Sequence, residues 1–479
     1  MFAEALPFAT CYVFELTEEM RRRCLAHLPS KTQQHWLSFC LTAMLLTGSL
    51  CWAAFERMGL GTYRIGALSW MFRHSKLQWP NLLQASVSLI LRLLKLMHGV
   101  LVLDDSDHRR AKTTQRIFGA HKVFDKKTGG YFNGQCLMFL VLVTDKFTLP
   151  VGVRFYRPDP KQQAWKREDE RLKKAGVKAA DRPKAPPADP AYPNKAEVAL
   201  SLLDGFGGSH PDFTVKAVLA DAAFGTHAFM EAACAKAGCA QAISQLRSDQ
   251  LVTFRRKAMT VKAYFASHAG VPQAVRVRGG KVEEMTVSSA RLWVKAHARK
   301  CFVIAVKNQG EDEYRYLVAT DLSWHTLDIL RCYTLRWLVE VFIADWKLCE
   351  GWAGMAKQPD EDGSVRGVTL SLLLDHALLI HPVQRACIEN RTPACTVGSL
   401  RQASHAEAFL QFVRKILRAA DPALMLEQLC EKIKMLFPLA PSKKHMNARD
   451  LGRQETSPSL RRYASPKTLS PRGHIPAPA

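Results

Sequence analysis

The chain has 479 residues, of which 67 are Lys or Arg and 43 are Asp or Glu, so its formal net charge is +24. A hydrophobic content of 48% excludes a mainly disordered chain, and the length is enough for about two to four domains. A chain this basic is attracted to polyanions, with nucleic acid as the leading partner and an anionic membrane surface as the second.

The 13 cysteines are scattered along the chain. Cys234 and Cys239 are the closest pair, and no histidine pair completes a zinc pattern. Buried free thiols in a reducing cytosol are the simplest explanation of this distribution.

Residues 36–55 carry no charged side chain, which makes a membrane span one interpretation of this stretch. The stretch also contains polar residues such as Ser38 and Thr42, and Gly48 interrupts it. We therefore expect a buried helix pair that is broken at Gly48, and no membrane.

The first 98 residues have a helical pattern with Gly turns and surface Arg and Lys. The pattern is compatible with a helix-turn-helix region that binds DNA, although any small helical bundle has the same features. The arginine run at 21–23 fits a solvated face as well as a phosphate contact.

From residue 99 the pattern changes to strands. A short apolar run at 100–103 leads into Asp104, and two further strands are expected at 136–144 and 147–156. A charged, Pro-rich insertion at 158–194 is expected to form a short helix and an exposed loop.

After this insertion, helices and strands alternate, and the strand at 213–220 leads into Asp221. The β-β-β-α-β-α-β order predicts an α/β core with a mixed sheet. Residues 253–320 are typical of a β-rich insertion, here expected as a small β-subdomain. Further helices are expected at 351–440, followed by a basic disordered tail at 441–479.

Residues 333–347 are predicted to form one amphipathic helix. On an ideal helix, the side chains that share its polar face lie within roughly 60° of one another; they are Tyr333, Arg336, Glu340 and Lys347. This face combines a carboxylate with two cations and a phenol, which suits a metal-bound phosphate chain. Arg336 and Glu340 also have the i,i+4 spacing of an ordinary surface ion pair.

Three carboxylates follow a common pattern: Asp104 and Asp221 come after strands, and Glu340 lies on an exposed helix face. Acids that end strands are also common turn residues. If the three meet, they repel one another unless divalent cations are present, and Mg²⁺ prefers such oxygen ligands. Two such ions would support in-line displacement at phosphorus, which is nuclease or strand-transfer chemistry.

Three motifs occur in order along the chain, namely Asp104-Asp105-Ser106, Leu219-Ala-Asp221-Ala-Ala-Phe224-Gly225 and Tyr333-x₂-Arg336-x₃-Glu340-x₆-Lys347. This set resembles the DDE transposases of prokaryotic insertion sequences, and the last motif resembles the Y-R-E-K signature of the fourth insertion-sequence family. The resemblance covers about residues 99–350. The first motif is compatible with Asp104 or Asp105 as its acid.

The resemblance implies a ribonuclease H-like fold with a β-rich insertion before the glutamate, flanked by helical N- and C-terminal regions. It implies Mg²⁺-dependent cut-and-paste transposition, with Mn²⁺ as a substitute ion. The implied metal ligands are Asp104, Asp221 and Glu340, and the implied phosphate-binding residues are Tyr333, Arg336 and Lys347.

The implied partners are double-stranded DNA, as terminal inverted repeats and target, and a second copy of the chain in the synaptic complex. The implied location is the cytoplasm of a prokaryotic cell, at the nucleoid. In some members a tryptophan of the β-insertion stacks on a flipped base; Trp293 and Trp324 are the candidates here, and core packing is the default for both. The alternative function is a DNA-binding relative that no longer catalyses.

Overall fold

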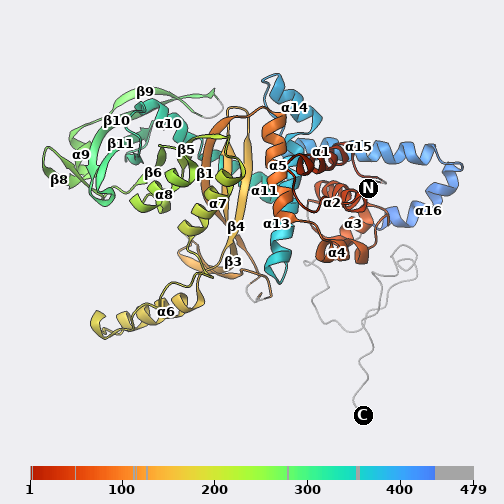
Figure 1. The fold of residues 1–479 in the computed structure, drawn as a ribbon, viewed down its shortest axis with the longest axis horizontal. Coiled ribbons are helices and arrows are strands. Elements are labelled where there is room, and N and C mark those ends of the chain that lie inside the picture. The colour runs from red at the N-terminus through yellow and green to blue at the C-terminus, as the bar shows by residue number, and fades with distance from the viewer. Residues whose placement is uncertain are drawn as a thin grey trace, which may run out of the picture.

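The computed structural model describes residues 2, 4–48, 50–111, 114, 116–125, 128–277, 280–351 and 357–436. One broad sheet occupies the middle and one end of the molecule, and helices from both ends of the chain gather at the other end (Figure 1). The tail predicted at 441–479 lies outside the described residues.

The N-terminal region is helical, as predicted. Ser30 and Gln33 form a capping box at the start of α2, and Gly48, with φ of +64°, ends it in the left-handed region that suits glycine. Pro80 lies in the first turn of α5, where the missing N–H costs no hydrogen bond. The helices are α1 Pro7–Arg22, α2 Lys31–Thr47, α3 Trp52–Met58, α4 Ile65–His74 and α5 Trp79–Leu93.

The C-terminal helices pack against this N-terminal region. One apolar cluster joins Trp36 and Leu41 of α2 to Leu370 and Leu374 of α13 and to Leu400 of α15. The two regions expected at 1–98 and 351–440 therefore share a core across the ends of the chain. The C-terminal helices are α13 Glu361–Leu379, α14 Pro382–Glu389, α15 Val397–Leu417 and α16 Pro422–Lys434.

The uncharged stretch at 36–55 spans a sharp bend. Helices α2 and α3 meet at 92°. The apolar side chains of α2 are buried among the N- and C-terminal helices, which together form the helical unit of the molecule. Among the described residues, no single helix is both long and apolar enough to cross a membrane, whereas two bent helix pairs, of which α2 with α3 is one, meet the length and composition criteria.

The sheet is mixed, which confirms the predicted α/β class. Strand β1 (His98–Arg109) pairs antiparallel with β3 (Gly130–Val143) and parallel with β5 (Thr214–Leu219), and β5 pairs parallel with β6 (Ala242–Leu246). Two further strands, β2 (His121–Asp125) and β4 (Thr148–Tyr156), pair with β3. The prediction that the first strand ends before Asp104 is wrong, because pairing with β3 continues to Arg109.

The β-rich insertion continues the same sheet and is not a detached subdomain. Strand β12 pairs antiparallel with β6, so the strand order runs β2-β3-β1-β5-β6-β12-β11-β10-β7-β8. A short helix, α9 (Val261–Ser267), lies within it. Its strands are β7 Leu251–Phe254, β8 Lys257–Thr260, β9 Val271–Arg276, β10 Val282–Val294, β11 Arg299–Asn308 and β12 Arg315–Ala319.

The insertion at 158–194 forms an arm beside the sheet (Figure 1). Its helix, α6 (Pro160–Lys174), has no buried residue, as expected for a chain segment this polar. The Pro-rich part folds back on this helix, because the Trp165 indole donates to the Pro183 carbonyl and Arg182 pairs with Asp169. The predicted helix is confirmed, and the predicted loop is anchored to it.

Helices cover both faces of the core sheet. One face packs against α7 (Lys195–Ser209) and α8 (His227–Ala237), and the other packs against α10 (Thr326–Thr334) and α11 (Trp337–Cys349). These two apolar layers fix the strands and helices that carry the polar residues of the candidate site.

Candidate active site

The pleat of β1 separates the two neighbouring aspartates. Val100 and Val102 point into the layer under α10 and α11, and Leu101 and Leu103 point to the opposite layer. Because side chains alternate along a strand, Asp104 faces α10 and α11, and Asp105 faces α7. The pairing of Asp105 with Lys195 at the start of α7, at 2.6 Å, agrees with this. Asp104 therefore shares a face of the sheet with the helices that carry Tyr333 and Glu340, whereas Asp105 lies on the other face.

The segment predicted as one helix is two helices with a tight junction. Helix α10 ends at Thr334 and α11 begins at Trp337. Between them the Arg336 N–H donates to the Tyr333 carbonyl, three residues back, so the backbone stays right-handed but is overwound. Arg336 thus lies at the junction, Tyr333 belongs to α10, and Glu340 lies in the first turn of α11.

Arg336 brings two of the predicted acids together. Its guanidinium donates to Asp104 at 2.9 Å and to Glu340 at 2.7 Å. The Asp104 side chain is 14% exposed and that of Glu340 is 49% exposed, so Asp104 is the more buried of the two acids and Glu340 faces solvent. The two acids, far apart in sequence, therefore share one cation.

Asp221 follows the strand next to β1. Val102 of β1 pairs in parallel with Leu219 of β5, two residues before Asp221. The Asp221 carboxylate accepts from the Ala223 N–H at 3.0 Å and caps a short 3₁₀ turn (Ala222–Phe224). Its carbonyl accepts from the Ser244 hydroxyl at 2.7 Å. The carboxyl ends of these adjacent parallel strands thus bring Asp221 to the Asp104 side of the sheet.

The charge state of Asp104 reflects this crowding. Burial raises its pKa to about 6; the Arg336 guanidinium opposes this rise, and the charges of Asp105 and Asp221 add to it. A buried carboxylate next to like charges is poised to gain a cation, and an all-oxygen donor set is the type that Mg²⁺ prefers. Asp104, Asp221 and Glu340 therefore fit a divalent cation by their chemistry.

Tyr333 is largely buried beside the carboxylates. Burial raises the pKa of its hydroxyl, and the Arg336 charge opposes that rise. Tyr333 and Arg336 line one end of a cavity of about 390 Å³ that extends along the β-insertion to Lys281 and Arg315. The charged side chains that line it are three cations and one acid, and each of these cations pairs with a carboxylate; they are Lys281, Arg315, Arg336 and Glu283.

Lys347 is held further along β1. Its ammonium donates to the Asp107 carbonyl at 3.0 Å, and burial lowers its pKa. Its position on α11, two turns after Glu340, follows from the predicted spacing, and the strand that it reaches is the one that carries Asp104.

The two candidate tryptophans differ in environment. Trp293 of β10 is 49% exposed, whereas Trp324 packs against the apolar layer under α10 and α11. Core packing, the default for both, is therefore wrong for Trp293.

A second polar cluster near the site, formed by Asp105, Asp107, Cys136 and Lys195, was not predicted from the sequence. Asp105, Asp107 and Cys136 bring their ligand atoms within 4.8 Å of one another, and Lys195 pairs with Asp105. Lys195 is fixed there by a capping box between Asn194 and Glu197 at the start of α7. Only this capping pattern was readable in the sequence; the contact with β1 depends on the tertiary fold.

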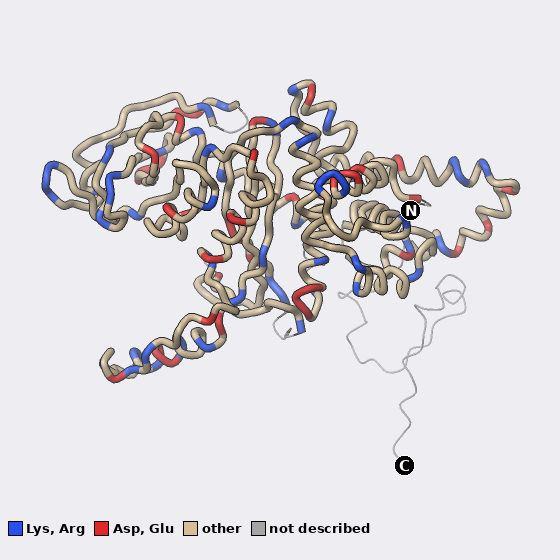
Figure 2. Tube along the Cα trace, in the orientation of Figure 1, with Lys and Arg blue, Asp and Glu red and all other residues tan. Residues whose placement is uncertain are grey.

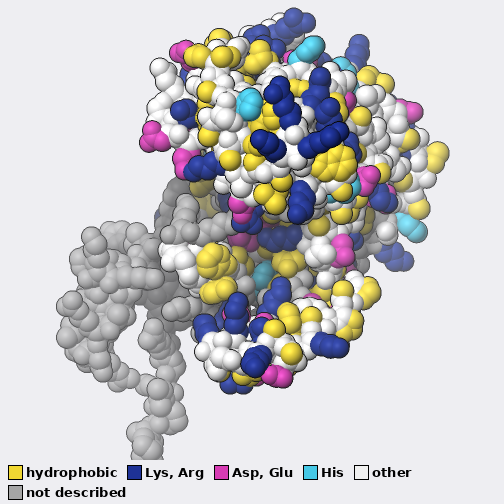
Figure 3. All heavy atoms as spheres, turned by 90° about the vertical axis from the view of Figure 1, so that its left-hand side faces the viewer, with side chains coloured by type: hydrophobic (Ala, Val, Ile, Leu, Met, Phe, Trp, Pro, Cys, Tyr) yellow, Lys and Arg dark blue, Asp and Glu magenta, His cyan; other side chains and the backbone are white. Residues whose placement is uncertain are grey.

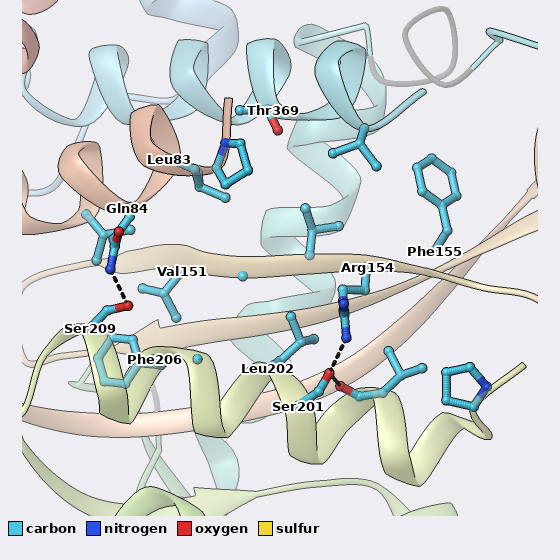
Figure 4. A pocket seen from close by; sticks show the side chains of 18 of the residues that line it. Leu83, Gln84, Val151, Arg154, Phe155, Ser201, Leu202, Phe206, Ser209 and Thr369 are labelled. Carbon is cyan, nitrogen blue, oxygen red and sulfur yellow. Dashed lines mark hydrogen bonds between the residues drawn. The ribbon is translucent and has the colours of Figure 1, made fainter. Parts of the chain in front are cut away.

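A larger cavity than the one beside Tyr333 lies elsewhere in the described part of the chain. It measures about 770 Å³ and lies between α5, β4, α7 and α13, with Arg154 donating to the Ser201 hydroxyl and Gln84 bonded to Ser209 (Figure 4). None of the three acids lines it, so this cavity is separate from the candidate site.

Comparison with protein families supports this assignment of the core. The family described as DDE superfamily endonuclease matches residues 23–301, which include Asp104 and Asp221 and end before Glu340. The match begins within the N-terminal helices, so it crosses the boundary expected at residue 98. A comparison with curated proteins gives no match. The mixed sheet is consistent with a ribonuclease H-like DDE core, and the chain belongs to the DDE superfamily of endonucleases.

Proposed function

We propose that the protein is a cut-and-paste transposase of an insertion sequence, which cleaves DNA at the ends of its element and joins them to target DNA. The observation that carries this proposal is the contact of Arg336 with both Asp104 and Glu340, next to the strand that leads to Asp221. The Y-R-E-K spacing of Tyr333, Arg336, Glu340 and Lys347 supports the insertion-sequence assignment.

The acids would hold the divalent cations on which DDE superfamily enzymes depend. Bound at Asp104, Asp221 and Glu340, Mg²⁺ or Mn²⁺ would supply charge for the attacking and leaving oxygens at phosphorus. In the free protein, the Arg336 guanidinium occupies the space between Asp104 and Glu340 and keeps their charges compensated.

The cations near the three acids would bind the DNA backbone. The forked N–H donors of the Arg336 guanidinium suit phosphate oxygens. A phosphate that approaches Asp104 and Glu340 would therefore compete with these acids for the guanidinium. Tyr333 lies beside Arg336 in the cavity and would donate its hydroxyl to a phosphate oxygen. Lys347, held on β1 by the Asp107 carbonyl, would bind a phosphate further along the strand.

Transposition requires two element ends in one complex, so the active form would contain at least two copies of the chain. Each copy would bind duplex DNA as a terminal inverted repeat and then as target. The hydroxyl that attacks in the joining step would come from the cleaved strand itself, which needs no covalent link to the protein.

The test uses a supercoiled plasmid that carries the gene with its natural flanking DNA, incubated with Mg²⁺ or Mn²⁺. We expect nicking at the inverted repeats with the wild-type protein and none with Glu340→Gln. The control is Glu389→Gln, which removes an exposed glutamate of α14 that also pairs with an arginine. Specific binding of the ends without any nicking by the wild type would instead indicate a DNA-binding relative that no longer catalyses.

A further inference from the structure

The hairpin between β7 and β8 turns on two arginines. Phe254 pairs with Lys257, so Arg255 and Arg256 alone form the turn. Their φ angles are +48° and +67°, and they are the only two consecutive non-glycine residues with positive φ in the described part of the chain. Positive φ at both central residues is the pattern of a type I′ turn.

Arginine is a poor choice for this turn. The Cβ of an L-residue crowds the backbone at positive φ, so such turns favour Asn-Gly or Gly-Gly. Both arginines are exposed, and neither forms an ion pair with any described carboxylate. The Arg255 guanidinium lies 5.2 Å from the Phe254 ring, and its charge also acts on the Tyr264 hydroxyl. No ion pair with a described residue thus accounts for the strain, which points to an external ligand for these side chains.

The surroundings of the hairpin are basic and include an exposed aromatic ring. Strand register places Trp293 opposite Thr253 of β7 on one side and opposite Lys300 of β11 on the other. Lys300 and Lys257 are exposed. Figure 2 shows the β7–β8 hairpin in blue at the left-hand end, and Figure 3, which faces this end, shows Lys and Arg gathered on its upper part.

The hairpin lies at the end of the sheet. Strand β8 is last in the strand order, whereas Asp104 lies on β1, seven strands away along the sheet. The tip is therefore separate from the candidate site at Asp104. A ligand that reaches both sites must be long and carry negative charge along its length, as duplex DNA does.

We propose that Arg255 and Arg256 form a second DNA contact, which binds backbone phosphates of duplex DNA away from the candidate active site. This inference rests on the proposed function for the identity of the ligand. Two forked guanidinium groups on a narrow tip can approach phosphates on one strand without reading base edges, so the contact is independent of sequence.

The decisive variant is Arg255→Asn with Arg256→Gly. It gives the turn its preferred residues, so we expect the melting temperature to be unchanged or higher. We expect weaker binding of a duplex of random sequence, with the slope of log K against log salt shallower by about 1.8, for two lost phosphate contacts. The ratio of wild-type to variant affinity for the duplex should then increase about twelvefold when the salt concentration is lowered from about 200 to 50 mM.

Two further variants separate charge from turn geometry. Arg255→Lys with Arg256→Lys keeps both charges, so its salt slope should stay at the wild-type value. Arg414→Gln with Arg418→Gln removes the same charge from exposed positions at the end of α15, at the opposite end of the molecule, and should leave the slope within error of wild type (Figure 1). An equal loss in this control, or no loss in the Asn-Gly variant, would overturn the proposal.

The outcomes also separate this inference from the proposed function. Failure of the wild-type protein to bind any duplex would contradict both. Salt-dependent binding by the wild type that the Asn-Gly change leaves unaltered would contradict the hairpin contact alone. Retained hairpin-dependent binding with no nicking at the element ends would contradict only the transposase activity.

Discussion

The guanidinium of Arg336 donates to the carboxylate of Asp104 at 2.9 Å, although the two residues are 232 positions apart in the chain. The contact depends on the strand pleat that points Asp104 toward α10 and α11, and on the tight junction that places Arg336 at the start of α11. The same guanidinium reaches Glu340 one turn later. Arg336 therefore acts as an internal counter-ion for a carboxylate site that would otherwise repel itself.

Replacing this counter-ion should make the fold depend on added metal. We expect Arg336→Gln to lower the free energy of unfolding by about 2 kcal/mol without divalent ions, because it leaves the mostly buried Asp104 carboxylate uncompensated. Mg²⁺ or Mn²⁺ should restore much of this loss by binding the freed acids. Chemical denaturation with and without the ion measures both effects.

The matched control is Arg385→Gln on α14, which breaks an exposed ion pair with Glu389. Such a pair contributes at most about 1 kcal/mol, and added Mg²⁺ should not change the result. Equal stability of the Arg336 variant and the wild type in metal-free buffer would show that the guanidinium does not compensate the site.

The two neighbouring aspartates should have different mutant phenotypes. Asp104→Asn is expected to abolish cleavage with little loss of stability, because the removed charge is one that burial disfavours. Asp105→Asn should retain cleavage but destabilise the fold, since it leaves the Lys195 ammonium without the carboxylate it contacts at 2.6 Å. Plasmid nicking and thermal melting on the same preparations measure the two properties. The opposite pattern would mean that the strand pleat was assigned to the wrong face.

Metal binding should weaken in mild acid. A carboxyl must lose its proton to bind a cation, and the pKa of Asp104 is raised to about 6 by burial. Below that pH we expect the Mn²⁺ affinity to fall by up to about tenfold per pH unit. This fall should begin at a higher pH than for a site whose aspartates have ordinary pKa values. Calorimetric titration of Mn²⁺ at several pH values measures this dependence. In Asp104→Asn the remaining dependence should move to lower pH; if it does not, another group controls the affinity.

Features that depend on short-range sequence patterns could be predicted from the sequence. The helical N-terminal region, the break at Gly48 and the polar spacing from Tyr333 to Lys347 all depend on local periodicity or turn chemistry. The α/β class could be predicted because apolar strands alternate with helices in chain order. The resemblance of the acidic motifs then identified the superfamily.

Features that depend on long-range pairing could not be predicted. The extension of β1 to Arg109 results from pairing with β3, and the continuity of the β-insertion with the core results from pairing of β12 with β6. The shared core of the two helical regions arises from contacts between α2 and α13, which no sequence period reveals. The Lys195 contact and the exposure of Trp293 are likewise set by the assembled sheet.

A buried carboxyl pair at the end of α11 should make stability depend on pH. Glu350, which caps α11, is fully buried, and its carboxyl lies next to that of Asp375 on α13. Burial raises both pKa values, that of Asp375 to about 7 and that of Glu350 well above its ordinary range. Since α11 also carries Glu340 and Lys347, this pair connects the helix of the candidate site to the helical unit.

The sign follows from proton counts. Above about pH 4 the unfolded chain has lost these protons, whereas the folded protein keeps them until its raised pKa values are reached. The folded state therefore binds more protons, and its stability falls as pH rises from about 4 toward and beyond 7, by up to about 1.4 kcal/mol per pH unit for each group.

Glu350→Gln removes one of these groups, so we expect a shallower decline and a gain in stability relative to wild type at pH 8 that is absent at pH 5. Glu427→Gln, at an exposed position of α16, should follow the wild-type curve. Urea unfolding across this range gives the comparison, and parallel curves for wild type and Glu350→Gln would show that Glu350 does not hold its proton in the folded state.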